Sequence, residues 1–247
     1  MDHRLLLALL FSACVLGCLI ILLTGLRIVL KHSLLSPERQ KTFFRRTAVL
    51  LTIWILLLGG LSLSGWFAEF SALPPRIPLA LLLPLPFVLA VSFSPAGKLL
   101  LGVLPPHWLI YFQSFRIVVE LLLWMAVLFT LLPVQMSFEG RNFDVVAGLL
   151  TLPVAYYCYV KKTWSSVVAL VYNIAGLLLL LNIVLIAVWS MPLPIRRFYN
   201  TPDSSLLVRF PFIFLPGFLV PLAYSLHIFS IRQWVLDRRM KMVGMSV

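Results

Sequence analysis

The stretch LLLALLFSACVLGCLIILLTGL, which runs from Leu5 to Leu26, decides the fold class of this protein. It carries no charged side chain and is as long as the roughly 20 residues that an α-helix needs to cross the hydrocarbon of a bilayer. Arg4 in front of it gives the region a likeness to a signal peptide, whose apolar core is shorter. We therefore expect a first membrane span that is retained.

The composition of the whole protein extends this expectation. Of 247 residues, 62% are hydrophobic and 11% are charged, and the mean hydropathy is +1.04. An average soluble domain carries about 25% charged residues, and a domain of roughly 250 residues still exposes about a quarter of its unfolded surface. A water-soluble fold could not hide this much apolar surface. We predict an all-α transmembrane helix bundle that forms a single domain.

Seven apolar runs are accepted as membrane spans, because each holds about 20 mostly apolar residues or comes close to that length. The third is short and contains Pro84 and Pro86, so it should be kinked, and the fifth is short with a polar start. No internal repeat is visible. The predicted spans are 5–26, 47–67, 77–94, 117–134, 145–160, 166–190 and 211–231.

The orientation follows from the basic residues of alternate loops, since cytoplasmic loops are enriched in Lys and Arg. The split is 14 against 6 and predicts an outside N-terminus and a cytoplasmic C-terminus. The richer side holds Arg27, Lys31, Arg39, Lys41, Arg45, Arg46, Lys98, Arg116, Lys161, Lys162, Arg232, Arg238, Arg239 and Lys241. The other side holds Arg4, Arg76, Arg141, Arg196, Arg197 and Arg209.

Two connections deviate from plain loops. The segment Ala96–Phe115 contains a Pro105-Pro106 pair and several aromatic residues, and we expect a bent segment at the cytoplasmic interface. Met191–Phe210 contains three prolines and is expected to be an ordered external loop, with a simple polar connector as the alternative.

Polar residues inside the predicted spans are few, and a charge there costs roughly 2.5–3.5 kcal/mol on insertion scales. Gln113, Arg116 and Glu120 share one helix face, and the last two have the i, i+4 spacing of an ion pair. In one interpretation Arg116 reaches the interface and Glu120 merely neutralises it. In the other, Glu120 is a proton or cation site.

Helix rise places Asn173 and His227 in the same cytoplasmic third of the bilayer as Glu120. If their spans are neighbours, these side chains could line a polar cavity that opens to the cytoplasm and relays protons. The alternative for His227 is a hydrogen bond at headgroup level.

The motif FEGRNFD joins the fourth and fifth predicted spans on the outer side. Asp144 or Asn142 can cap the fifth helix, and Arg141 can form a salt bridge, so structural roles account for the motif. A substrate-binding loop is the alternative. The polar residues of this external turn are Glu139, Arg141, Asn142 and Asp144.

Other kinds of site are not indicated. The net charge of +12 is assigned to loops at an anionic membrane face and not to nucleic-acid binding. Cys14, Cys18 and Cys158 lack the spacing of a zinc site or disulfide framework. GxSxG, HExxH and P-loop motifs are missing from the sequence, so no cofactor or metal is predicted and an enzyme is not favoured.

Three stretches together resemble a group of uncharacterised bacterial polytopic inner-membrane proteins. They are Phe115-Arg116 with Glu120, the FEGRNFD motif, and the last span with Pro216, Pro221 and His227. The resemblance covers the fourth to seventh spans. It implies a bacterial inner-membrane location and brings no activity with it.

Three functions follow as hypotheses. The first is a small-solute or ion/proton permease, or a channel component, with a cavity between the fourth, sixth and seventh spans. The second is a non-catalytic scaffold or sensor with a tightly packed bundle, whose partner is another membrane protein or a second copy of this one. The third is a lipid-modifying enzyme with Glu120 and His227 as an acid–base pair. The lipid bilayer is the partner common to all three.

Overall fold

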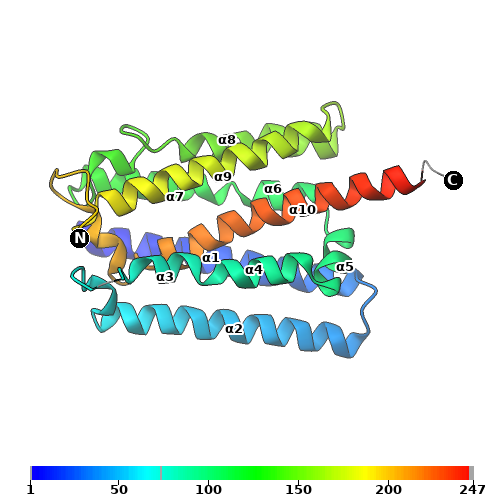
Figure 1. Cartoon of the computed structure of the whole chain (residues 1–247), viewed down its shortest axis with the longest axis horizontal. Helices are drawn as coiled ribbons and strands as arrows, with labels where there is room; N and C mark the ends of the chain where they lie inside the picture. The colour runs from blue at the N-terminus through cyan, green and yellow to red at the C-terminus, as the bar shows by residue number, and fades with distance from the viewer. Residues whose placement is uncertain (1, 73, 245–247) are drawn as a thin grey trace.

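The fold is helical throughout the part of the protein that the structure describes, which is residues 2–72 and 74–244. This computed structural model contains α-helices, short 3₁₀-helices and two π-helical turns, and no strand among those residues. The helices lie side by side along one axis, and consecutive segments run in opposite directions when the two shorter ones described below are included (Figure 1). The prediction of an all-α fold is confirmed.

Five helices are long and apolar enough to cross a membrane. They are α1 (His3–His32), α2 (Pro37–Leu63), the joined α6 (Pro106–Phe112) and α7 (Phe115–Leu128), α9 (Ser166–Trp189), and the π-helical turn Leu215–Leu219 continued by α10 (Val220–Gly244) as far as Met240. Each overlaps one of the predicted spans in sequence, because a membrane helix needs a long apolar run and such a run is visible in the sequence.

Two other predicted spans are built differently. The third consists of α3 (Ile77–Leu82) and α4 (Pro84–Phe93), interrupted before Pro84, whose missing N–H breaks the helical hydrogen bonding. Together with α5 (Pro95–Val103), which turns away by 76°, they form a sixth candidate span. The fifth consists of α8 (Asp144–Ala155) and the π-helical turn Tyr156–Val160, a shorter apolar helix.

The predicted boundary of the fourth span is wrong. The helix begins at Pro106 and ends at Leu128, so the second half of the expected interfacial segment belongs to the span itself. A proline pair reads as a helix break in sequence, whereas proline at the first helical position is favoured because no N–H is needed there. Only α5 and the turn after it remain as the bent part.

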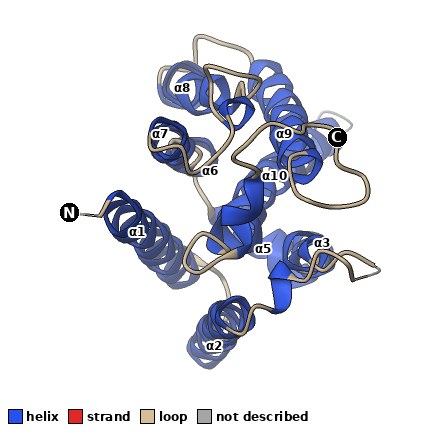
Figure 2. Cartoon of the chain, turned by 90° about the vertical axis from the view of Figure 1, so that its left-hand side faces the viewer, coloured by secondary structure: helices blue, strands red, loops and turns tan. Residues whose placement is uncertain are grey.

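The outer surface of the bundle is apolar. Side chains such as Ile20 and Leu56 on the two outermost helices expose 64% and 68% of their surface. Most of α10 is buried, and Figure 2, which looks along the helices, shows it near the centre with the others around it. Apolar groups on both the inside and the outside fit a membrane protein, since soluble monomers rarely expose contiguous apolar patches of this kind.

The connections gather at two ends of the bundle (Figure 1). The start of α1 and the connections at 64–76, 129–143 and 190–214 lie at one end, named here the N-terminal end. The α1–α2 and α8–α9 connections, α5 and the last turns of α10 lie at the other, named the C-terminal end.

The 191–210 connection is ordered, as predicted. It contains the 3₁₀-helix Ser204–Val208, and the Ser204 hydroxyl donates to the Ala187 carbonyl oxygen over 2.7 Å. Leu207 of this segment is buried in the core. The connection therefore closes the N-terminal end of the bundle and is more than a polar linker.

Candidate functional site

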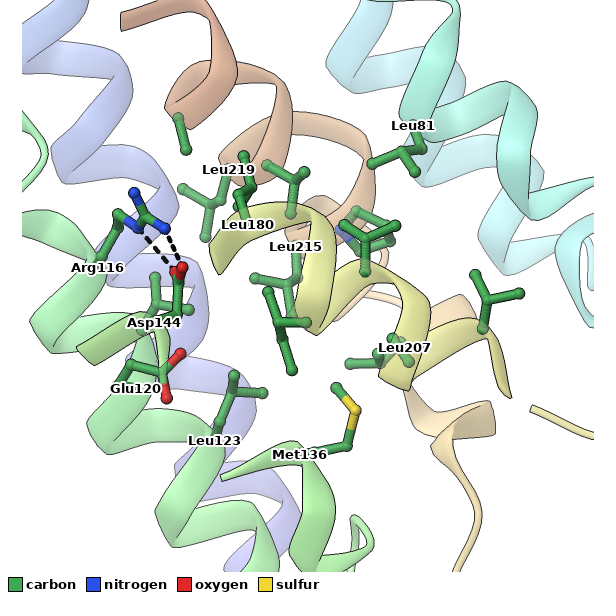
Figure 3. Close-up of a pocket in the computed structure, with 18 of the residues that line it drawn as sticks. Leu81, Arg116, Glu120, Leu123, Met136, Asp144, Leu180, Leu207, Leu215 and Leu219 are labelled. Carbon is green, nitrogen blue, oxygen red and sulfur yellow. Dashed lines mark hydrogen bonds and ion pairs between the residues drawn. The ribbon is translucent and has the colours of Figure 1, made fainter. Parts of the chain in front are cut away.

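An ion pair between α7 and α8 lies inside the bundle. Arg116 exposes 2% of its surface, and its Nε donates to Asp144 Oδ2 over 2.7 Å while its Nη2 donates to Asp144 Oδ1 (Figure 3). Asp144 is the first residue of α8. Gly148 lets the helices approach, since a Cβ there would overlap the Ile117 side chain. The paired N–H groups of a guanidinium match the two carboxylate oxygens, which makes this an interaction of high geometric specificity.

The same guanidinium reaches α10. Arg116 Nη1 donates to His227 Nε2 over 2.8 Å, and because a guanidinium only donates, this nitrogen must be the acceptor. His227 Nδ1 then carries the hydrogen and donates to Asn173 Oδ1 over 2.8 Å. Asn173 Nδ2 in turn donates to Ser230 Oγ over 2.9 Å. The hydrogen-bond pattern therefore fixes His227 as a neutral imidazole in one tautomer.

Glu120 is held by a different residue. Asn142 Nδ2 donates to Glu120 Oε1 and Oε2 over 2.6 and 2.7 Å and to the Met136 carbonyl over 3.1 Å. Asn142 Oδ1 accepts the Asp144 N–H over 3.0 Å. Glu120 exposes 1% of its surface and Asn142 none, and both Glu120 oxygens accept from the one Asn142 amide. Asn142 thus links Glu120 to the ion pair of Arg116.

A cavity of about 80 Å³ adjoins the three charged side chains. Figure 3 shows Arg116, Asp144 and Glu120 on one side of it, and leucine side chains from α3, α7, α9 and the Leu215–Leu219 turn around the rest. Met136 and Leu207 from the connections at the N-terminal end also line it. The rest of the wall is apolar, so a small ligand or water molecule in this space would find its polar partners only at the side formed by these three side chains.

The charges of this site do not balance. One guanidinium faces two carboxyl groups, and both oxygens of Asp144 are already engaged by Arg116. A second negative charge on Glu120 would have no salt bridge of its own among the described residues, because the nearby guanidinium of Arg116 is bonded to Asp144. Burying an unpaired charge is costly. Glu120 is therefore suited to hold a proton or to attract a cation from the cavity.

The structure brings most of the predicted site residues together and separates others. Arg116, Glu120, Asn173 and His227 join with Asn142 and Asp144 in one network. The expected Arg116–Glu120 pair is wrong, because the guanidinium turns to Asp144 on the neighbouring helix.

Gln113 does not belong to this network. Its Nε2 donates to the Ala223 carbonyl of α10 over 2.9 Å, and its Oε1 is buried without a partner among the described residues. The bond ties the junction of α6 and α7 to the central helix. Gln113 is therefore a packing residue, although it shares the sequence spacing of Arg116 and Glu120.

The residues of the predicted external turn lie in two different surroundings. Glu139 and Arg141 are exposed, and Arg141 lies over the Phe198 ring instead of forming the expected salt bridge. The N-cap residue of α8 is Phe143, and Asn142 just before it accepts the first N–H of the helix, whereas Asp144 uses its carboxylate for Arg116 and does not cap. Half of the turn thus belongs to the interior.

Glu120 lies farther along its helix than expected. Helix rise from the predicted start of the fourth span places Glu120 near the inner end, but it stands 14 residues after Pro106 and eight before Leu128. It therefore lies closer to the N-terminal end of the bundle, within reach of Asn142. Arg116 and Glu120 were predicted for one side of the membrane, and Asn142 and Asp144 for the other. They form one site because the helix starts earlier than the proline pair suggests.

Gly176 of α9 is a part of the site that sequence reasoning missed. Its carbonyl oxygen accepts from Arg116 Nη2 over 3.3 Å, and a Cβ at this position would overlap the His227 imidazole ring. The available signal was its spacing, since Gly176 follows Asn173 by three residues and shares its helix face.

The close approach of Gly176 to His227 gives a first testable prediction. Gly176→Ala should lower the free energy of unfolding by about 1–3 kcal/mol, because the added methyl group must displace a buried ring that is hydrogen-bonded on both nitrogens. Unfolding in detergent, followed by circular dichroism, measures it. Gly25→Ala is the matched control, since a Cβ there meets nothing within 4 Å. Equal stability of the two variants would contradict the tight packing around His227.

Comparisons with protein families, with curated proteins and with solved structures find no match to this protein. Among the described residues, groups of three or more His, Cys, Asp or Glu side chains that could hold a metal ion are also not found.

Proposed function

We propose that the protein is an integral protein of a bacterial inner membrane that crosses it seven times, with the N-terminus outside and the C-terminus in the cytoplasm. Support comes from the alternating direction of the helices, with α3–α4 and α8 lying alongside the longer ones (Figure 1). Arg116 is buried in the bundle, so it is not counted among the basic residues of the loops. The remaining basic residues divide 13 to 6 in favour of the C-terminal end, as the positive-inside rule requires of a cytoplasmic face.

We further propose that it acts as a small-solute or ion/proton permease, or as a channel component, with Glu120 binding the proton or cation. The observation that carries this proposal is the group of three buried ionisable side chains, Arg116, Glu120 and Asp144, on the wall of one cavity. Ionisable residues inside membrane bundles are rare and typically mark ion or substrate pathways. Arg116 engages both oxygens of Asp144, and Glu120, which Arg116 does not hydrogen-bond, is proposed as the exchangeable group.

The cavity also favours this function over the alternatives. A scaffold or sensor is expected to have a tightly packed bundle, whereas residues of α7, α9 and the Leu215–Leu219 turn surround an open space. A lipid-modifying enzyme would need Glu120 and His227 to act on one substrate. His227 is fully buried, and its two nitrogens are hydrogen-bonded to Arg116 and Asn173. Glu120 and His227 are therefore not favoured as an acid–base pair.

The test is proton flux into liposomes that contain the purified protein and a pH-sensitive dye. Glu120→Gln keeps the size and the acceptor oxygen but cannot exchange a proton, so we expect flux at least tenfold below that of the wild type. Glu139→Gln is the control, because it removes an exposed carboxylate three residues from Asn142. Equal flux in wild type and Glu120→Gln would remove Glu120 from the mechanism and return weight to the scaffold hypothesis.

A further inference from the structure

A basic groove lies between the end of α1 and the start of α2, at the C-terminal end of the bundle. Its volume is about 880 Å³, and it is unrelated to the Glu120 cavity. Four of its lining residues are cationic and one is acidic, which leaves an excess of three positive charges. The cations are Arg27, Lys31, Lys41 and Arg45, and the acid is Glu38.

The groove is held in shape by hydrogen bonds of the short α1–α2 connection. The Ser33 hydroxyl and N–H both donate to the Leu30 carbonyl at the end of α1, over 2.7 and 3.1 Å. Gln40 Nε2 of α2 donates to the Leu35 carbonyl over 2.8 Å. The cationic side chains therefore project from a fixed backbone, which lowers the entropic cost of binding a ligand.

The groove offers free positive groups. All four cationic side chains are exposed, and none has a hydrogen bond or ion pair with another described residue. The α2 helix begins with Pro37, which lines the groove, and the Ser36 side chain makes no capping bond to the first N–H groups of the helix. Open N–H groups of a helix start favour phosphate oxygens and add to the cationic side chains.

Apolar groups accompany these charges. Leu30 forms a buried floor with the partly buried Phe44, and Leu34 at the tip of the connection exposes 89% of its surface. An exposed leucine beside clustered cations is typical of a segment that meets the boundary between lipid headgroups and acyl chains. A soluble anion would use the charges and not the leucine, so the combination favours a lipid.

We propose that this groove binds the phosphate headgroup of an anionic phospholipid, whose acyl chains lie along the exposed apolar faces of α1 and α2. Basic pockets between membrane helices on the cytoplasmic side have the right charge and position for such headgroups. The inference rests on the membrane orientation proposed above and not on the role of Glu120.

The test is a binding titration with phosphatidylglycerol on the full-length protein in neutral detergent, read by native mass spectrometry. Lys31→Gln with Lys41→Gln should weaken binding about 30-fold, since each Lys or Arg near an anionic surface contributes a factor of about five. Lys161→Gln with Lys162→Gln removes the same charge from another connection at the same end and should change binding less than twofold. Thermal unfolding of each variant verifies that it is folded.

Three outcomes would overturn the proposal. Equal weakening in both double variants would assign binding to the general charge of this end. Equal affinity for phosphatidylcholine would remove the need for an anionic headgroup, and displacement by millimolar inorganic phosphate would assign the groove to a free anion. Proton flux reports separately on Glu120, so lipid binding with unchanged Glu120→Gln flux would refute only the permease proposal.

Discussion

Arg116→Met is expected to lower the free energy of unfolding by about 3–5 kcal/mol. The guanidinium makes four hydrogen bonds to groups on three other helices, and its removal leaves the Asp144 carboxylate buried without its partner. Reversible unfolding in mixed micelles measures the change. Arg141→Met is the control, because Arg141 is exposed and should cost less than 1 kcal/mol.

A second substitution separates the cost of the lost pair from the cost of a lone charge. Arg116→Met combined with Asp144→Leu should be more stable than Arg116→Met alone, because two apolar side chains can replace a buried ion pair with little loss. If the double variant were less stable than the single one, the ion pair could not be the main interaction of Arg116.

Asn142→Leu is expected to lower the free energy of unfolding by about 3 kcal/mol, since the loss of its amide leaves the Glu120 carboxyl group and the first N–H of α8 without partners. The same unfolding measurement applies. Asn182→Leu is the matched control, because it loses one bond, to the Arg141 carbonyl, which is worth roughly 0.6 kcal/mol in a membrane helix.

The link between Asn142 and Glu120 can be tested by rescue. Adding Glu120→Leu to Asn142→Leu should recover part of the lost stability, because the unsatisfied carboxyl group is then gone. A double variant as unstable as the sum of the two single variants would show that the residues act independently, contrary to the network.

The helical fold was predictable because it depends on long apolar runs. A run such as Leu5–Leu26 determines its own helix in a bilayer, whatever its neighbours do. The start of the fourth span was not predictable, since Pro105 and Pro106 fit a helix break and a helix start equally well. With that boundary, Glu120 was expected far from the predicted external turn, whereas it accepts a hydrogen bond from Asn142 in that turn.

The residue types of the site were also predictable, because polar side chains stand out in apolar segments. Their partners were not. Arg116 has an acidic residue four positions away on its own helix, and sequence spacing favours that local pair. The actual partner, Asp144, depends on how α7 packs against α8 at Gly148, which is a property of the tertiary structure.

The arrangement of Arg116 has a consequence for how the protein is made. Of the three partners, Arg116 leaves the ribosome first during synthesis. Asp144 follows 28 residues later, and His227 emerges only with the last helix. A solitary guanidinium in lipid is unfavourable until the carboxylate arrives. The α6–α7 segment and α8 should therefore integrate as a hairpin, and the translocation machinery must retain them until α10 emerges and closes the bundle around them.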